Sequence, residues 1–456
     1  MKRSILIFTM VFTGIQGVLL AQDEGVRQTA VPTGLLSLDE CIRIALENQP
    51  AIGASQGAIL SAESEYTQVL SSRFPQLQFE AGAYITNTPL QSSNVIASTP
   101  IVDPQQGTKF IPSTRLTMRQ PIYDFGRTER ALESKAKLIK VAEMSLQSTE
   151  DDVILNVHQA YYNYGLAKQV VQINEERVAQ STKRLERAKG FFEVGKLPES
   201  DVSKAELDVA NAELQLIDAR GKLRLAKVTL NGSMGIIEAG ENLAEYQTTD
   251  ELQFVPFEMT LSESIESTLT TRKEVKAADL RIQASRSALS AAKSQYFPII
   301  TASAGVGPYL IQKDPSDPLS RDQFKMGYNI GLNFAWPIFQ GLTVRAEIFE
   351  AQGAIRIATS QANVLRQQVL QEVQERYFSV KVAEERYKAS EKLVDQSQKN
   401  LALAAGRFET GLGAAIEFSD ANLALANAKI DRTTALYNFE IERSKFLYSI
   451  GKIRGK

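Results

Sequence analysis

Two different rhythms of apolar and polar residues occur along this chain. In four short segments every second residue is apolar, a period typical of a β-strand with one apolar face. The clearest segment lies at about 324–336, where Phe324, Met326 and Tyr328 begin an apolar row that ends at Trp336. The other three lie at about 76–86, 113–121 and 299–311. Each is predicted to be a strand that can cross a bilayer, which takes about 9 to 11 tilted residues.

Two much longer segments follow a seven-residue repeat, which is typical of helices packed as coiled coils. They are predicted to be helical hairpins at about 126–235 and 341–451. In the first, one heptad position carries large residues such as Val157, Tyr164 and Val171, and the other carries small ones. Large side chains of one helix can then pack against small ones of its neighbour. The first helix alone would extend about 95 Å at a rise of 1.5 Å per residue.

The second half of the chain repeats the first. The repeated landmarks are Phe74-Pro75 and Phe297-Pro298, Pro121-Ile122-Tyr123 and Pro337-Ile338-Phe339, Tyr161-Tyr162 and Tyr377-Phe378, Phe192-Glu193-Val194-Gly195 and Phe408-Glu409-Thr410-Gly411, and Met234-Gly235 and Ile450-Gly451. The offset is 223 for the first pair and 216 for the others. A register kept over so many landmarks indicates a duplicated unit.

These patterns divide the chain into four regions. Residues 1–21 are predicted to be a signal peptide, because Lys2 and Arg3 precede an apolar stretch that ends at Ala21; an uncleaved membrane anchor is the alternative. Residues 22–235 form the first repeat and residues 259–456 the second, joined by a linker at 236–258. The segments outside the strands and hairpins are expected to pack as a belt around the middle.

The composition excludes several classes of function. Without Lys2 and Arg3 the chain has 49 basic (51 − 2) and 53 acidic side chains, a net charge of −4 with no basic footprint for nucleic acid. One cysteine, Cys41, and one histidine, His158, cannot form a disulfide framework or a zinc site within the chain. Cys41 is predicted to be a buried thiol and His158 to be solvated. No phosphate loop or nucleophile motif occurs, so we expect neither an enzyme nor a cofactor or metal.

Four amphipathic strands cannot close a barrel alone. An open edge in hydrocarbon would leave backbone groups unpaired, at a cost of several kcal/mol each. The chain is therefore expected to assemble. Three copies would supply twelve strands and a lumen wide enough for solutes, whereas two copies would supply only eight.

The duplicated order of two strands and a long hairpin, behind a signal peptide, resembles the TolC-like outer-membrane factor family. The resemblance covers essentially the whole mature chain, and its sharpest parts are the hairpin-tip segments Phe192–Val202 and Arg407–Glu417. It implies a homotrimer with a twelve-stranded barrel in the lipid of the cell outer membrane and a coiled-coil α-helical barrel in the periplasm. Such proteins are passive ducts of tripartite efflux pumps or type I secretion systems. Their partners are a periplasmic adaptor, also called a membrane fusion protein, and an inner-membrane transporter of the RND or ABC class.

The resemblance also implies functional residues at the two tips. The residues implied in adaptor docking are Val194, Gly195, Lys196, Leu197, Thr410, Gly411, Leu412 and Gly413. Asp201, Phe408, Glu417 and Asp420 match positions of the periplasmic gate and pore. Some relatives carry an arginine at the position of Gly413 that locks the gate to the aspartate matched by Asp201, so an ionic lock of that form is not expected here. For Glu417 and Asp420 the alternative is an ordinary role as carboxylates near a helix N-terminus.

Two functional hypotheses of different classes remain at this point. The leading one is an export duct whose driving energy comes from partners, since no nucleotide-binding motif is present. The alternative is a structural or adhesive trimeric coiled coil on the cell surface, without transport activity. The paired strands favour the duct.

Overall fold

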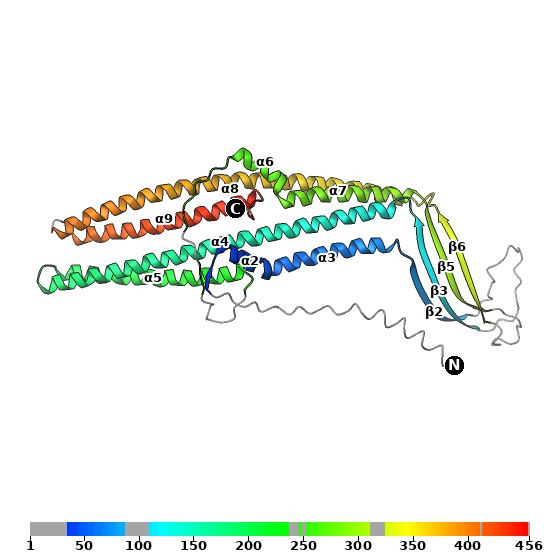
Figure 1. Cartoon of the computed structure of the whole chain (residues 1–456), viewed down its shortest axis with the longest axis horizontal. Coiled ribbons are helices and arrows are strands. Elements are labelled where there is room, and N and C mark those ends of the chain that lie inside the picture. Colours follow the sequence, from blue (N-terminus) through cyan, green and yellow to red (C-terminus); the bar gives the residue numbers. More distant parts are fainter. Residues whose placement is uncertain are drawn as a thin grey trace.

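The computed structural model describes residues 34–86, 109–236, 246–248, 252–310, 324–410 and 413–454. The molecule is long and narrow, with a β-sheet at one end and two helical tips at the other (Figure 1). The predicted signal peptide at 1–21 lies outside the described residues, as do the tip residues Gly411 and Leu412.

The sheet contains the four predicted long strands. These are β2 (Gln76–Thr86), β3 (Lys109–Tyr123), β5 (Ile299–Leu310) and β6 (Phe324–Ala335). All neighbours are antiparallel and the order is β2-β3-β5-β6, so β2 and β6 form the two outer edges. The register shifts between Pro121 and Tyr123, where β3 approaches the helices.

The strand register separates the two faces of the sheet. Phe79 lies opposite Leu116, Leu116 opposite Val306, and Val306 opposite Tyr328, so one apolar row crosses all four strands. The side chains of this row are exposed in the single chain. Because successive residues point to opposite faces, the glutamines, arginines, serines and glycines between them share the other face. This is the alternation that the sequence predicts.

Two helices run the whole length of the molecule. They are α4 (Arg127–Glu193) and α8 (Thr343–Glu409), each of 67 residues. Each turns back at its tip into a helix of 35 residues, α5 (Glu199–Ser233) or α9 (Ala415–Ser449). The start of each hairpin is offset by 216 residues (343 − 127 and 415 − 199), so the duplication is kept in the structure as equal lengths.

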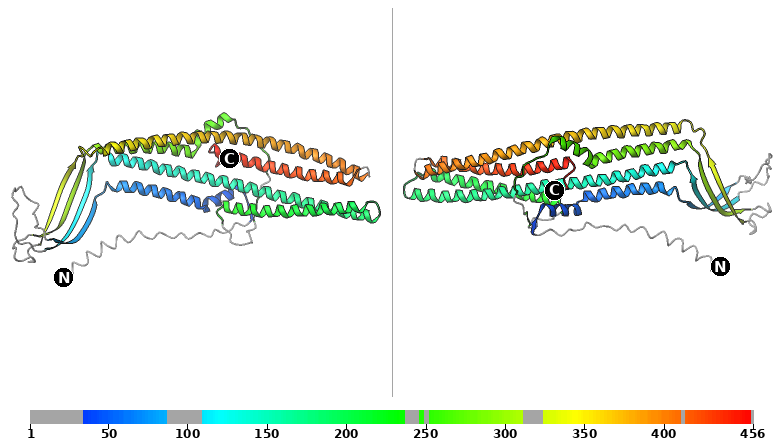
Figure 2. Two further views of the ribbon diagram at one scale, coloured as in Figure 1. Left: turned by 180° about the vertical axis from the view of Figure 1, so that it is seen from behind. Right: turned by 45° about the horizontal axis from the view of Figure 1, so that its top comes forward.

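Shorter helices complete the half nearer the sheet. α3 (Pro50–Ser71) packs against α4, and α7 (Lys273–Lys293) packs between α4 and α8. The helices therefore lie in the order α3-α4-α7-α8 near the sheet and α5-α4-α9-α8 near the tips (Figure 2). We expected the segments outside the hairpins to form a belt. For α3 and α7 this expectation is wrong, because both extend along the long helices to the sheet.

Small elements do gather around the middle. β1 (Gly34–Leu36) pairs in parallel with β4 (Tyr246–Thr248) beside α2 (Leu38–Asn48). On the other side lies α6 (Leu261–Thr271). The short 3-10 helix η2 (Ser294–Tyr296) lies instead at the sheet end of α7, just before β5.

A buried ion network fixes the start of α7 against the second hairpin. The Arg272 guanidinium pairs with Glu274 at 3.1 Å and with Glu372 at 3.2 Å, and it lies 5.0 Å from the centre of the Tyr448 ring. The Tyr448 hydroxyl in turn donates to Asp152 on α4. These contacts join α7, α8, α9 and α4 at one level of the molecule.

The hydrophobic core follows the predicted heptad positions. Val157, Ala160 and Tyr164 are buried in a cluster that also contains Leu230 and Tyr246. Cys41 is fully buried in the same cluster, as predicted. A second cluster joins the middle of α8 to α9 through Val373, Val380, Phe439 and Phe446.

The environment of His158 differs from the sequence prediction. We expected a solvated ring, but it is partly buried, with Nδ1 3.0 Å from the Ser444 hydroxyl oxygen and its centre 6.0 Å from the Tyr162 ring. Burial lowers the pKa of His158 to about 4, while the Asp39 carboxylate acts in the opposite direction. The heptad places the residue on a flank of α4, and packing of α9 against this helix covers that flank.

Candidate functional site

The turn between α4 and α5 is a tight helix ending. Gly195 has a φ of +74°, a left-handed conformation that costs glycine little. Its N–H donates to the Phe192 carbonyl at 2.9 Å, and the Lys196 N–H donates to the Phe191 carbonyl at 2.9 Å. This pair of bonds is the Schellman motif, which satisfies carbonyls left open at a helix end. The side chains of Val194 and Lys196 are exposed around the turn, and that of Leu197 is partly buried.

The second tip is closed by a different backbone contact. The Gly413 N–H donates to the Arg407 carbonyl at 2.9 Å. A Cβ atom added at Gly413 would lie 3.0 Å from the Arg407 Cβ and 3.1 Å from the Phe408 nitrogen. The backbone therefore passes too close to α8 for a side chain to be accommodated without a shift. This explains locally why glycine, and not arginine, occupies the position; Thr410 beside it is exposed.

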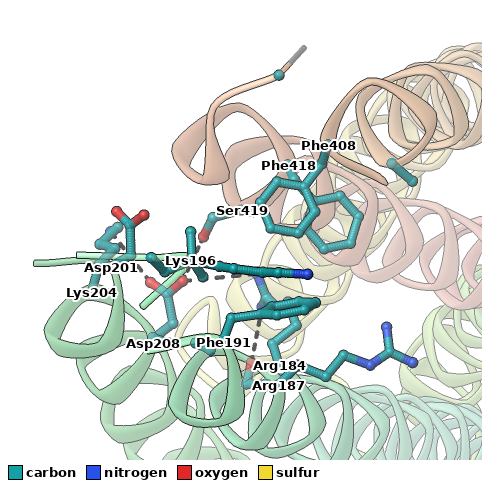
Figure 3. Close-up of a pocket in the computed structure, with 16 residues that line it drawn as sticks. Arg184, Arg187, Phe191, Lys196, Asp201, Lys204, Asp208, Phe408, Phe418 and Ser419 are labelled. Atoms are coloured by element: carbon teal, nitrogen blue, oxygen red, sulfur yellow. Dashed lines mark hydrogen bonds and ion pairs between the residues drawn. The ribbon is translucent and has the colours of Figure 1, made fainter. Parts of the chain in front are cut away.

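A cavity of 770 Å³ lies between the two hairpins just behind the tips (Figure 3). Among the predicted residues it brings together Lys196, Leu197, Asp201, Phe408 and Gly413. Hairpin one supplies all the charged residues of the lining, and hairpin two supplies an aromatic pair. The further lining residues are Ser181, Arg184, Arg187, Ala188, Phe191, Lys204, Ala205, Asp208, Ala405, Phe418 and Ser419.

Asp208 is the central polar group of this junction. Its carboxylate accepts a hydrogen bond of 2.5 Å from the Ser419 hydroxyl on α9. It also lies 3.3 Å from the Lys204 ammonium on α5 and 3.8 Å from the Arg184 guanidinium on α4. Only 19% of the Asp208 side chain and 21% of the Arg184 side chain are exposed, so solvent screens this pair less than a surface pair. The Asp208–Ser419 bond links hairpin one directly to hairpin two.

An aromatic contact lies next to this polar link. The rings of Phe408 and Phe418 stack with centres 5.7 Å apart and planes 10° apart. The Arg184 guanidinium lies 5.7 Å from the centre of the Phe418 ring, within the range of a cation–π contact. Burial lowers the pKa of Arg184, and the carboxylate of Asp208 opposes that shift. Arg184 therefore contacts both the carboxylate of its own hairpin and the ring of the other.

The remaining predicted gate residues lie apart from this link. Asp201 lines the cavity from the first turn of α5, where its N–H donates to the Pro198 carbonyl at 3.1 Å. Glu417 pairs with Arg407 at 3.3 Å across the second tip, with both side chains largely exposed. Asp420 is also exposed, one turn further along α9.

Sequence reasoning missed the four side chains that join the hairpins: Arg184, Asp208, Phe418 and Ser419. Asp208 lies two helical turns beyond Asp201, outside the tip signature that drew attention to the earlier aspartate. Ser419 is 211 positions away from Asp208 in the chain. A signal was present, however, because the aromatic Phe418 directly follows the tip segment Arg407–Glu417.

The described residues contain neither a metal-binding cluster nor a membrane-spanning helix. No group of three or more histidine, cysteine, aspartate or glutamate residues in the described ranges is placed to hold a metal ion. No helix in this part of the chain combines the length and the apolar character needed to span a membrane.

Comparison with known families identifies the chain. The family described as outer membrane efflux protein matches residues 41–236 and 264–448, which include both hairpins and all four long strands. The chain belongs to this family. It is therefore a protein of the outer membrane, as the resemblance implied.

A curated relative is the outer membrane protein TolC of Escherichia coli strain K12. The two are 24% identical over 328 residues, which make up 70% of this chain and 64% of the relative. This chain thus matches less than two thirds of that relative's length.

Two solved structures share the fold. CusC has a TM-score of 0.74 at 18% identity, with 94% of this chain and 95% of CusC covered. The CmeC outer membrane channel of Campylobacter jejuni also has a TM-score of 0.74, at 15% identity, with 91% of this chain and 86% of CmeC covered.

Proposed function

We propose that the chain forms a homotrimeric channel, with a twelve-stranded barrel in the outer membrane and a helical duct in the periplasm. Export through it is passive, and an inner-membrane transporter supplies the energy through a periplasmic adaptor. The names of the relatives, which describe efflux and channel proteins, support this class of function.

Each layer of the molecule has two open edges. One side of the molecule ends with β2 in the sheet, α3 in the upper helices and α5 near the tips. The other side ends with β6 and with α8 over its full length. Every layer is therefore open on the same two sides, and a second copy can continue all three layers at once. Edge pairing would satisfy the outer strands, whose unpaired backbone groups cannot lie in hydrocarbon.

The open helix edges carry apolar side chains. On α5 the residues opposite the seam with α4 are largely exposed, namely Leu207, Leu214, Ile217, Leu225 and Val228. On α8 the exposed residues are Phe349, Ile357, Val364, Phe378, Val382, Leu393 and Leu403. By contrast, among the described residues the inner helix α7 has no large apolar side chain that is exposed. Such rows at helical spacing are typical of a second helix interface.

The apolar face of the sheet fits a lipid environment. From Met326 to Phe334 it presents five apolar side chains on β6, and Leu332 is 77% exposed in the single chain. No charged residue lies on this face of the described strands. The opposite, polar face would then line the lumen.

The hairpin tips are the proposed adaptor sites and gate. Adaptor docking involves the exposed turn residues Val194, Gly195, Lys196 and Thr410, with Leu197 and Gly413 beside them, and Gly411 and Leu412, which lie outside the described residues. Separation of the hairpins would break the Asp208–Ser419 link and the Phe408–Phe418 stack. We therefore assign the closed state of the gate to these contacts, with Asp201, Glu417 and Asp420 facing the passage.

One observation carries this proposal: the four-stranded sheet has one uncharged apolar face and two open edges, and it sits at the end of helices about 100 Å long.

The test compares Leu332→Arg with Asn333→Arg, two neighbours on opposite faces of β6. A charge facing lipid near the midplane costs about 2–4 kcal/mol, whereas the lumen tolerates it. Leu332→Arg should abolish membrane-inserted trimers and Asn333→Arg should retain them, measured by the mass of the detergent-extracted complex and by conductance in planar bilayers.

The outcomes separate the hypotheses. A monomeric wild-type mass, or equal behaviour of the two variants, would refute the barrel. Trimers without conductance under any condition would favour the alternative of a structural or adhesive coiled coil. The family match does not favour that alternative.

A further inference from the structure

The polar face of the sheet is strongly basic. Besides Lys109, the first residue of β3, four charged residues of the described strands lie on it: Glu80 on β2, Arg115 and Arg119 on β3, and Lys325 on β6. Three of the four are cations, although the whole chain has a net charge of −2. This excess of positive charge is therefore local to one face of one element.

The Arg115 side chain extends across the neighbouring strand β5. The Arg115 guanidinium donates to the Asn329 side-chain oxygen at 3.3 Å, so it reaches over β5 from β3 to β6. It passes over Gly305, where an added Cβ would lie 2.6 Å from that same oxygen and 3.6 Å from the Arg115 Nε. At Gly307 an added Cβ would collide with the Thr114 carbonyl oxygen. Gly305 therefore leaves room for the Asn329 side chain that accepts the hydrogen bond, and Gly307 leaves room for the backbone of β3.

The single acidic side chain does not neutralise these cations. Glu80 lies opposite Arg115 in the register, but Arg115 turns away from it towards β6. The Glu80 carboxylate instead accepts a hydrogen bond of 2.9 Å from the Gln78 amide. Within the described ranges, Arg115, Arg119 and Lys325 have no ion-pair partner, and all three side chains are exposed.

We propose that Arg115, Arg119 and Lys325 make the barrel lumen a basic passage that attracts anionic solutes, and that these three residues determine its charge preference. This inference rests on the proposed function, because only a closed barrel gathers the charges of three chains around one lumen. Like charges facing a water-filled passage raise the local concentration of the opposite ion. The preference would be opposite in sign to that of an acidic gate formed by Glu417 and Asp420.

The test uses cysteines on the two faces of β6. A side chain at Gly331 meets no atom closer than the Ser303 hydroxyl oxygen at 4.0 Å, so Gly331→Cys fits on the polar face in the same row as Arg119. Its neighbour Ile330→Cys is the matched control on the apolar face. The parent chain gives the background, because Cys41 is fully buried. The full-length protein in outer-membrane vesicles is treated with an anionic and a cationic methanethiosulfonate of similar size.

The expected result is a higher rate with the anionic reagent at Gly331→Cys, by about tenfold at low ionic strength, falling as salt is added. Adding Arg115→Gln, Arg119→Gln and Lys325→Gln should remove this advantage. Ile330→Cys should react with neither reagent. This readout does not require an open gate.

Two contrary results would have different meanings. Equal rates with both reagents at Gly331→Cys, or an advantage unchanged by the triple substitution, would overturn the basic passage while leaving the barrel intact. If Ile330→Cys reacts as fast as Gly331→Cys, or if both are protected, the placement of the two faces is wrong and both proposals fall. In planar bilayers the triple variant should also shift the reversal potential towards cations.

Discussion

The two hairpins have the same lengths but different side chains where they meet. At an offset of 216, Arg184 corresponds to Asn400, Asp208 to Ala424, and Phe418 to Val202. The guanidinium and the carboxylate of the junction therefore occur in hairpin one only and the Phe418 ring in hairpin two only, whereas Ser419 corresponds to Ser203 and Phe408 to Phe192. Duplication set the geometry of the helices, and later divergence set the chemistry of the contact between them. Exchanging residues between corresponding positions tests this division.

The largest effect is expected for Asp208→Ala, which gives hairpin one the residue of hairpin two. The change leaves Ser419, Lys204 and the partly buried Arg184 without their shared carboxylate, at a cost of about 1–3 kcal/mol. We expect a lower thermal unfolding temperature and a larger open fraction in single-channel recordings. The reciprocal change, Ala424→Asp, lies on an exposed position and should alter neither quantity. Wild-type gating in Asp208→Ala would show that this link does not hold the tips together.

The second prediction concerns the carboxylates of hairpin two. Glu417→Gln combined with Asp420→Asn should reduce the cation preference of single channels several-fold, because three chains would lose six negative charges near the passage. The reversal potential in a salt gradient measures the change. Asp201→Asn, at the hairpin-one position that corresponds to Glu417, removes three charges instead of six and should give a smaller reduction. An unchanged reversal potential in the double variant would remove both residues from the pore.

A smaller effect is expected for Phe418→Val, which gives hairpin two the residue found in hairpin one. It removes the stack with Phe408 and the contact with Arg184, together about 1–2 kcal/mol. Faster amide hydrogen exchange near the ends of α8 and α9 should accompany a modest rise in open fraction. As a control, Val202→Ala shortens the side chain at the corresponding position of hairpin one and should change amide hydrogen exchange less than Phe418→Val does. Equal exchange in wild type and Phe418→Val would contradict a role for the ring.

The smallest effect near neutral pH concerns His158, which corresponds to Gln374 in hairpin two. Because burial holds its folded-state pKa at about 4, below the ordinary value of 6.5, the unfolded chain binds more protons between these values. Stability should therefore fall as the pH drops from about 6.5 to about 4, by at most about 1.4 kcal/mol for each pH unit. His158→Gln should remove that part of the pH dependence in thermal unfolding. Gln374→His, at an exposed position, should add none. Identical pH profiles in wild type and His158→Gln would contradict the assignment.

The sequence predicted the long elements well because each carries a repeated local signal. β6 alternates apolar and polar residues over its whole length, and α4 repeats its heptad over many turns. A single residue that departs from either pattern therefore does not change the prediction. The contact between Asp208 and Ser419 has no such signal, since it joins residues 211 positions apart through the packing of two hairpins. The pairing of Gly34–Leu36 with Tyr246–Thr248 is equally hidden, because three residues are too few to show a period. The division into domains and the roles of the tip residues stay predictions.

The unbroken course of α4 and α8 gives the molecule a mechanical property. From Tyr161, at the level of the buried cluster, to Glu193 at the tip, the helix rises about 50 Å at 1.5 Å per residue. A tilt of roughly 6° about the middle therefore swings a tip by about 5 Å, close to one helical turn. The hairpins act as levers, and a partner needs to apply only a small rotation to separate side chains that touch at their ends.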